Sequence, residues 1–146
     1  MKPVAIREIL EYPDPRLKEV SEPVEWVSDE IKEVIEDLVD TMRSSPGCVG
    51  MAAPQIGEKK RIIVFDASNH KKVNNHHGLT VLINPTILSK GGRQICREGC
   101  LSVPDYTGNV ERATWIFVEG LDRYGNTDVI EAEGFEAVVI LHEMDH

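Results

Sequence analysis

Apolar residues recur at helical spacing in two segments of this chain, which lie on either side of a long region rich in β-branched residues. The first segment runs from Ile31 to Met42, directly after Ser28, a residue type that commonly caps helix N-termini. The second covers residues 135–146, after Gly134. Helices on both sides of a strand-rich region predict an α+β fold, with antiparallel or mixed β-sheets around the C-terminal helix and one amphipathic helix near the N-terminus.

The region between the helices divides into short segments with the composition of strands, separated by turn residues. The predicted strands cover residues 61–66, 81–88 and 94–100, and the second of them is expected to end near Gly91-Gly92. Two more are predicted at 113–121 and 126–131, on either side of a hairpin turn at 122–125. Gly99 is expected to break the third of these strands. Four of the eight prolines fall within the first 27 residues, which predicts an extended arm there rather than a long helix.

A run of small residues at positions 48–57 separates the first predicted helix from the first predicted strand. The run offers little core volume, but its two glycines permit close backbone approach, so it is expected to form the wall of a site. The polar loop after the first strand contains three histidines that are expected to be solvated: His70, His76 and His77.

Chain length and charge limit the classes of function. A chain of 146 residues, 41% of them hydrophobic, suits one domain. The formal charge of −9 repels phosphate and anionic lipid, which argues against nucleic-acid and membrane partners. No segment has the pattern of a secretory signal or a membrane span, and three cysteines are too few for a disulfide scaffold. A cytoplasmic protein is therefore expected.

The closing pentapeptide, His-Glu-Met-Asp-His, has the residue types and spacing of a metal site on a helix. Because positions i and i+4 lie on one face, His142 and His146 can bind one metal ion, and Glu143 beside them can act as general base. The alternative is a solvated helix end with scattered histidines. Such catalytic sites commonly have three protein ligands. In this sequence the third must lie upstream, where Cys100 is the best candidate and Cys96 is expected to be a core residue.

Three separated segments, residues 48–57, 98–102 and 142–146, together resemble the motifs of the peptide deformylases. The resemblance covers essentially the whole chain and implies a single catalytic domain over residues 1–146. The implied activity is that of a bacterial-type, cytoplasmic metallohydrolase, which removes the N-terminal formyl group from formyl-methionyl nascent polypeptides and releases formate. Nascent chains at the ribosome exit are the implied partners, with no direct nucleic-acid binding and no membrane.

The same resemblance implies a ligand set and roles for the residues around it. Cys100, His142 and His146 would hold one divalent metal, Fe²⁺ in the cell and Zn, Ni or Co in purified samples. Glu143 would be the base, while Gln55 and the backbone N–H of Leu101 would hold the formyl oxygen. The implied substrate-binding residues are Val49, Gly50, Glu98, Gly99, Phe135, Val138 and Val139.

Alternatives stay open for several of these residues. Gly50 is expected to let the substrate backbone lie alongside as an added strand. Val138 and Val139 are expected to line an apolar slot for methionine with Val49 and Phe135, but plain core packing would also explain them. Two readings are open for Arg112, which either pairs with Glu98 or is a surface charge.

Two features depart from the family pattern. Cys48 stands where the family commonly has glycine, which is expected to put a third sulfur near the site and to change its sensitivity to oxidation. Family members also continue past the second histidine, whereas this sequence ends at His146 and lacks that tail. The missing tail leaves open a deformylase-like metal-binding protein with weak or no activity. The metal motif by itself also allows a peptidase, but the absence of a ligand downstream of His146 counts against it.

Overall fold

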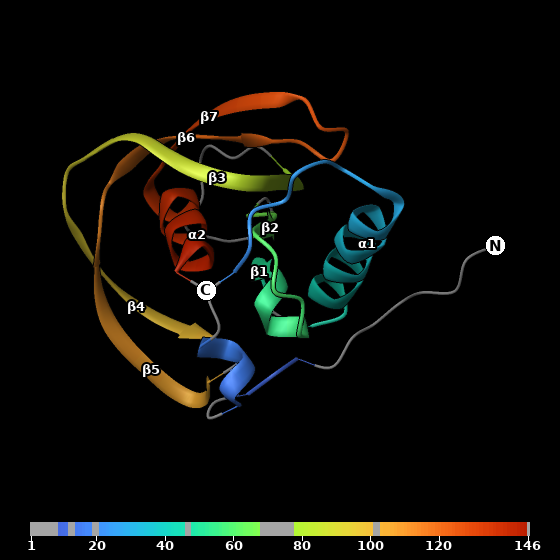
Figure 1. Ribbon diagram of the computed structural model, residues 1–146. Helices are drawn as coiled ribbons and strands as arrows, with labels where there is room; N and C mark the ends of the chain where they lie inside the picture. The colour runs from blue at the N-terminus through green and yellow to red at the C-terminus, as the bar shows by residue number, and fades with distance from the viewer. Residues whose placement is uncertain are drawn as a thin grey trace.

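The computed structural model describes residues 9–11, 14–18, 21–45, 48–67, 78–100 and 103–145, with the backbone alone described for residues 16, 18, 96–100 and 103–109. These ranges form two α-helices, two short 3₁₀ helices and seven strands (Figure 1). In chain order the elements are η1 (Pro15–Lys18), α1 (Asp29–Arg43), β1 (Gly50–Ala52), η2 (Ala53–Ile56), β2 (Ile62–Phe65), β3 (Thr80–Gly91), β4 (Gln94–Cys100), β5 (Val103–Arg112), β6 (Trp115–Leu121), β7 (Thr127–Glu133) and α2 (Gly134–Met144). The predicted α+β class, with one helix before the strands and one after them, is confirmed.

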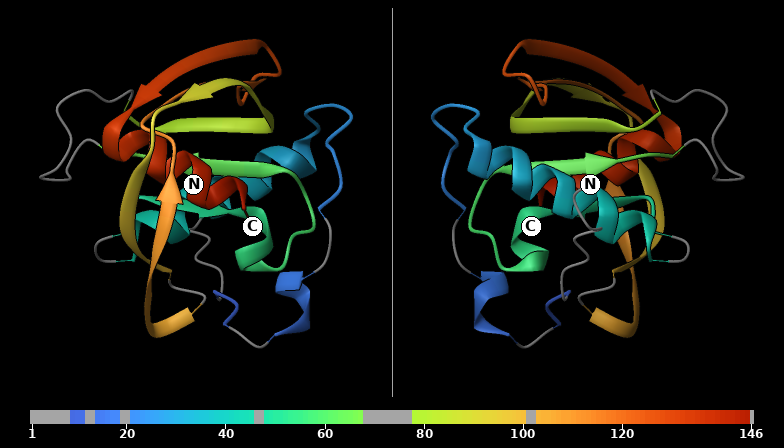
Figure 2. Two further views of the ribbon diagram at one scale, coloured as in Figure 1. Left: turned by 90° about the vertical axis from the view of Figure 1, so that its left-hand side faces the viewer. Right: turned by 90° about the vertical axis from the view of Figure 1, so that its right-hand side faces the viewer.

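The strands form a five-stranded sheet in the order β1-β2-β3-β6-β7 and a two-stranded sheet of β4 and β5, and all the paired strands are antiparallel. The β4–β5 hairpin extends away from the larger sheet beside α2 (Figures 1 and 2). Strand β1 lies at one edge of the larger sheet. The predicted hairpin turn joins β6 to β7, and there Asp122 Oδ1 accepts hydrogen bonds from the N–H groups of Tyr124 and Asn126.

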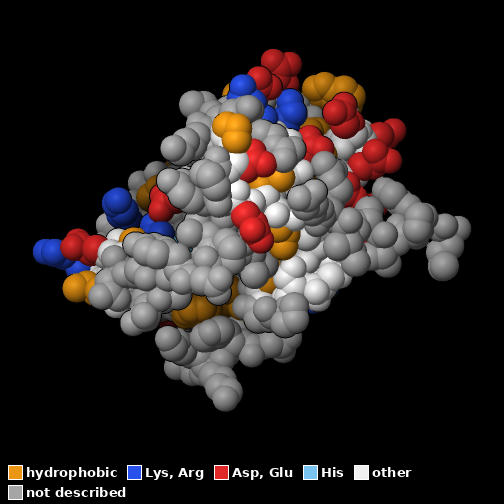
Figure 3. Space-filling view, turned by 90° about the horizontal axis from the view of Figure 1, so that it is seen from below, with side chains coloured by type: hydrophobic (Ala, Val, Ile, Leu, Met, Phe, Trp, Pro, Cys, Tyr) orange, Lys and Arg blue, Asp and Glu red, His pale blue; other side chains and the backbone are white. Residues whose placement is uncertain are grey.

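Helix α1 begins and ends where the sequence predicts. The Ser28 hydroxyl oxygen accepts a hydrogen bond from the N–H of Ile31 at 3.2 Å, and Asp29 and Glu30 in the first turn complement the positive end of the helix dipole. The apolar side of the helix, from Ile31 to Met42, is buried. Its solvent side is mostly acidic, and acidic side chains stand out along one side of the molecular face in Figure 3.

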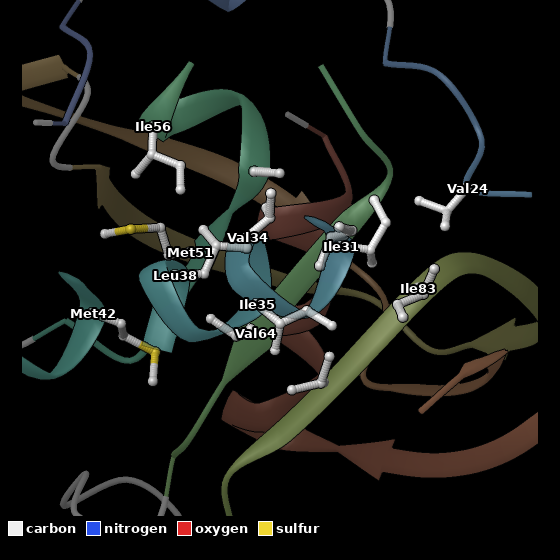
Figure 4. Close-up of a cluster of buried hydrophobic side chains, with 13 residues drawn as sticks. Val24, Ile31, Val34, Ile35, Leu38, Met42, Met51, Ile56, Val64 and Ile83 are labelled. Carbon is white, nitrogen blue, oxygen red and sulfur yellow. The ribbon is translucent and has the colours of Figure 1, made fainter. Parts of the chain in front are cut away.

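Strand β2 lies between the two helices and is buried on both faces. Ile62 and Val64 belong to the core cluster that α1 completes (Figure 4), whereas Ile63 and Phe65 belong to the second cluster, which α2 completes. Since alternate side chains of a strand point to opposite faces, a strand covered on both sides must be apolar at every position. This explains the continuous run Ile-Ile-Val-Phe.

The proline-rich N-terminal arm is held against the domain by hydrogen bonds. Asn84, which has a positive φ of 53°, accepts from the N–H of Val24 at 2.8 Å and donates to the carbonyl of Val24 at 2.7 Å. Nearer the N-terminus, the N–H of Leu10 donates to the carbonyl of Gln55 at 2.7 Å. The arm is therefore connected directly to the run of small residues.

Strand β5 was not predicted. Strand β3 ends at Gly91, as expected, and β4 has a register irregularity between Gly99 and Cys100, where a break was predicted, although the strand continues to Cys100. Strand β5 contains a proline and a glycine, which weaken its strand pattern in the sequence. Pairing with β4 along nearly its whole length outweighs these local preferences.

The run at positions 48–57 gives more to the core than its composition predicts. Met51 and Ile56 are both buried in the cluster under α1. The three histidines expected to be solvated, at positions 70, 76 and 77, lie outside the described residues. Among the helices that the structure describes, none is long and apolar enough to cross a membrane.

Candidate active site

Helix α2 carries the predicted metal-binding pentapeptide at its end. The helix begins at Gly134, whose φ of 57° is one that other residues rarely adopt, and the N–H of Gly134 donates to the carbonyl of Thr114 at 2.9 Å. The helix predicted over residues 135–146 is confirmed as far as Met144. In its last turns His142 is partly buried and Glu143 is buried.

Glu143 is buried next to Gly50 of strand β1. A Cβ atom added to Gly50 would lie 2.7 Å from Glu143 Oε2 and 2.9 Å from Val139 Cγ1, both closer than real Cβ atoms approach. Glu143 itself is 5% exposed. The fold therefore brings together two residues that were predicted from separate motifs, and the missing side chain of Gly50 makes room for the carboxylate.

Gln55, in η2, is buried at 2% exposure and has a fixed orientation. Its Oε1 accepts a hydrogen bond from the N–H of Ala52 at 3.0 Å, which directs the NH₂ end of the amide to the other side. Its own backbone carbonyl accepts the hydrogen bond from Leu10. The hydrogen bond from Ala52 therefore fixes the amide side chain, and the one from Leu10 fixes the backbone of the same residue.

The predicted apolar slot residues differ in their surroundings. Val139 belongs to the core cluster under α2, with Val49 and Phe135 partly buried against that cluster. Val138 is 4% exposed but belongs to neither core cluster among the described residues. Val139 thus packs in the core and also lies beside Gly50, whereas core packing with the described residues does not explain the burial of Val138.

Cys48 is the first residue of the run of small residues at positions 48–57. Its thiol donates to the carbonyl of Gly50 at 3.1 Å, and the side chain is partly buried against the cluster under α1. A third sulfur is therefore close to the residues of the predicted site.

Not all of the predicted ligands are described. Cys100 is the last residue of β4, but its side chain is outside the described set, and so are those of Glu98 and Cys96. Leu101 and His146 are outside it entirely. Within the described residues, no three His, Cys, Asp or Glu side chains are grouped so as to hold a metal.

Arg112, at the end of β5, is not a surface charge, so that alternative was wrong. Its side chain is 10% exposed, and its Nη1 lies 2.7 Å from Oδ2 of Asp145. Asp145 was not predicted to be a site residue. Its position was nevertheless a signal, because a carboxylate at the negative C-terminal end of a helix predicts a nearby cation.

The polypeptide deformylase family model matches residues 6–146 of the chain. The chain belongs to this family. It is 43% identical to peptide deformylase 2 of Vibrio cholerae over 143 residues, which are 98% of this chain and 82% of that protein. It is also 43% identical to the peptide deformylase of Alkalilimnicola ehrlichii over 143 residues, 98% of this chain and 78% of that protein.

Solved deformylase structures share the fold. A crystal structure of a peptide deformylase from Legionella pneumophila matches with a TM-score of 0.88 and 42% identity, covering 97% of this chain and 80% of that one. The peptide deformylase from Ehrlichia chaffeensis in complex with actinonin matches with a TM-score of 0.90 and 36% identity. The match covers 97% of this chain and 83% of that one. This deformylase is therefore a hydrolase that removes the formyl group from formyl-methionyl peptides, as the three motifs predicted, and the inactive alternative is not favoured.

The residues also fit the divalent metal that a metalloenzyme family implies. The predicted ligands, Cys100, His142 and His146, would offer one thiolate and two imidazoles, which zinc and iron both accept. The carboxylate of Glu143 is held inside the domain on the same turn of α2 as His142.

Proposed function

We propose that Glu143 moves the proton in this deformylation, at a divalent cation held by Cys100, His142 and His146. The observation that carries the proposal is the buried carboxylate of Glu143, which Gly50 accommodates on one side and which neighbours His142 in the chain. When bound, the cation supplies Lewis acidity that makes a water proton easier to remove and polarises an oxygen. In the cell this cation is Fe²⁺, and Zn, Ni or Co replace it in purified protein.

Glu143 takes a proton from the attacking water and later gives it to the leaving amine. Both transfers need a carboxylate that stays at one place throughout the reaction. The burial of Glu143 and its close fit against Gly50 and Val139 support this role, because they restrict where the carboxylate can go. The products are formate and a free N-terminus.

Gln55 and the N–H of Leu101 hold the formyl oxygen as negative charge develops on it. Fixed donors stabilise such charge best when they need not reorient during the reaction. The hydrogen bond from Ala52 to Gln55 Oε1 supports this role, since it holds the amide with its NH₂ group on the opposite side.

The substrate binds as an added strand along β1. An edge strand can pair with an extended peptide through main-chain hydrogen bonds, which do not depend on the peptide's sequence. The place of β1 at the edge of the larger sheet supports this mode. The methionine side chain enters an apolar slot lined by Val49, Phe135, Val138 and Val139. Glu98 and Gly99 of β4 also bind the substrate.

The substrates are nascent formyl-methionyl chains at the ribosome exit, in the cytoplasm. The formal charge of −9 supports an encounter without direct binding to ribosomal RNA.

Formate release from formyl-Met-Ala-Ser tests the proposal. Glu143→Gln is expected to lower kcat by about 100- to 10,000-fold with metal content unchanged, because it removes the proton carrier and keeps the side-chain size. Glu131→Gln, at an exposed carboxylate of β7, is the matched control and should leave kcat unchanged. Substantial formate release by Glu143→Gln would contradict the proposed role.

A further inference from the structure

The ion pair between Arg112 and Asp145 links strand β5 to the end of helix α2. The Nη1–Oδ2 distance is 2.7 Å, with the arginine side chain 10% exposed and the aspartate side chain 67% exposed. A second ion pair on the same hairpin, Arg93–Glu111, has a similar distance of 2.8 Å, but its arginine is 79% exposed. Arg112 is therefore packed into the protein rather than extended over its surface.

The place of Asp145 on the helix explains why a cation is needed there. Asp145 is the C-cap of α2, and its N–H donates to the carbonyls of Leu141 and His142 at 3.2 Å. A carboxylate at a helix C-terminus faces the negative end of the helix dipole, which disfavours it unless a cation lies nearby. Arg112 supplies that cation.

The segment 112–114 holds both ends of α2. The carbonyl of Thr114 accepts the N–H of Gly134 at the start of the helix, and Arg112 pairs with Asp145 just beyond its end. At 1.5 Å per residue an eleven-residue helix is about 16 Å long. Contacts that far apart constrain the position of the helix along its axis as well as its distance from the hairpin.

The ion pair therefore connects the two parts of the chain that carry the proposed ligands. Strand β5 pairs with β4 from Arg112 opposite Gln94 to Val103 opposite Cys100, while α2 carries His142. We infer that Arg112 and Asp145 are positioning residues for the metal, which hold the last turn of α2 against the Cys100 hairpin. The inference rests on the proposed function, because it takes Cys100, His142 and His146 as the ligands.

Zinc affinity, measured by competition with a chromophoric chelator, tests this inference. Replacing a residue that orients metal ligands typically weakens metal binding by about 10- to 100-fold. We expect at least about tenfold weaker Zn²⁺ binding for Arg112→Met and for Asp145→Asn. The double variant Arg112→Met/Asp145→Asn should bind Zn²⁺ about as tightly as whichever single variant has the lower affinity. The two losses should not add, since both substitutions remove the same interaction.

Charge reversal separates positioning from general stability. The double variant Arg112→Asp/Asp145→Arg restores an ion pair, so it should bind Zn²⁺ more tightly than Arg112→Asp alone. Arg93→Met, which removes the exposed ion pair of the same hairpin, is the matched control and should leave the affinity unchanged.

Unchanged Zn²⁺ affinity in Arg112→Met and Asp145→Asn would overturn the inference, and so would an equal loss in Arg93→Met. If Arg112→Met does not fold, Asp145→Asn still decides, since it changes a carboxylate that is 67% exposed. A parent protein that binds no Zn²⁺ would overturn the proposed function together with this inference. Full hydrolysis by Glu143→Gln would overturn the proposed proton transfer alone, so the two failures are distinguishable.

Discussion

Gly50 and Glu143 lie so close together that a methyl group on Gly50 would sit 2.7 Å from Glu143 Oε2. The same methyl group would meet Val139 Cγ1 at 2.9 Å, so the side chain of Val139 as well as the carboxylate would have to move. The smallest substitution in β1 therefore changes the position of the proposed base without touching it chemically.

Gly50→Ala is expected to lower kcat by up to about 100-fold, because a displacement of the order of 1 Å at a reacting group has effects of this size. Steady-state formate release together with Zn²⁺ titration checks it. Metal content should stay at the parent value, since the affected atoms belong to Glu143 and Val139. A kcat equal to that of the parent would show that the carboxylate tolerates the shift.

Gln55→Glu is expected to lower kcat/KM by about 100- to 1000-fold, the typical effect of removing one donor to a developing negative charge. The new carboxylate keeps an acceptor for the N–H of Ala52, so the local fold is preserved. Circular dichroism should match the parent, whereas the unfolding midpoint is expected to fall, because a carboxylate replaces an amide that is 2% exposed. Activity near the parent value would assign the formyl oxygen to other donors.

Metal removal by a chelator is expected to lower the thermal unfolding midpoint, because a ligand that binds the native state stabilises it. The free energy is about 2.7 kcal/mol when free metal is 100 times its Kd. Scanning calorimetry with and without added Zn²⁺ measures this. Glu143→Gln should show the same Zn²⁺-dependent shift as the parent, whereas His142→Ala should show little. An equal shift in His142→Ala would contradict its role as a ligand.

Asn84→Gly is expected to destabilise the protein by about 1–3 kcal/mol, because it removes both side-chain hydrogen bonds to the backbone of Val24 while it tolerates the positive φ. Asn84→Ala should be at least as destabilising, since the backbone conformation adds strain. Urea unfolding gives both values. Ordinary surface substitutions change the free energy of unfolding by up to about 0.5 kcal/mol. A decrease smaller than this would mean that the arm is held mainly by other contacts.

Ser28→Ala is expected to cost about 1 kcal/mol of unfolding free energy through loss of the N-cap of α1. Ser89→Ala, on an exposed position of β3, is the control and should change stability by less than about 0.5 kcal/mol. Neither variant should alter kcat/KM. Equal stability of the two would show that the cap contributes nothing measurable.

Local patterns predicted the elements that form by local rules. The capped amphipathic helix from Ser28 and the hairpin around Asp122 each depend on residues close in sequence, and both were confirmed. Strand β5 was missed because its proline and glycine weaken the local signal, while its stability comes from pairing with β4.

The residues of the candidate site were likewise predictable from local patterns, but their contacts were not. The pentapeptide and the small-residue run indicated Glu143 and Gly50 separately, but their contact depends on the tertiary structure. The partner of Arg112 was also beyond local reasoning, since Asp145 lies on another element far along the chain.

Strand β2 contributes alternate side chains to two cores, and this has a consequence for how the protein loses activity. Because Ile62 and Val64 face α1 while Ile63 and Phe65 face α2, loss of either helix would expose one apolar face of β2 to water. We expect the two cores to open together, with the β2 amides among the slowest to exchange hydrogen. Damage to the packing of α1, on the far side of the sheet from Glu143, would then shorten the lifetime of the catalytic geometry.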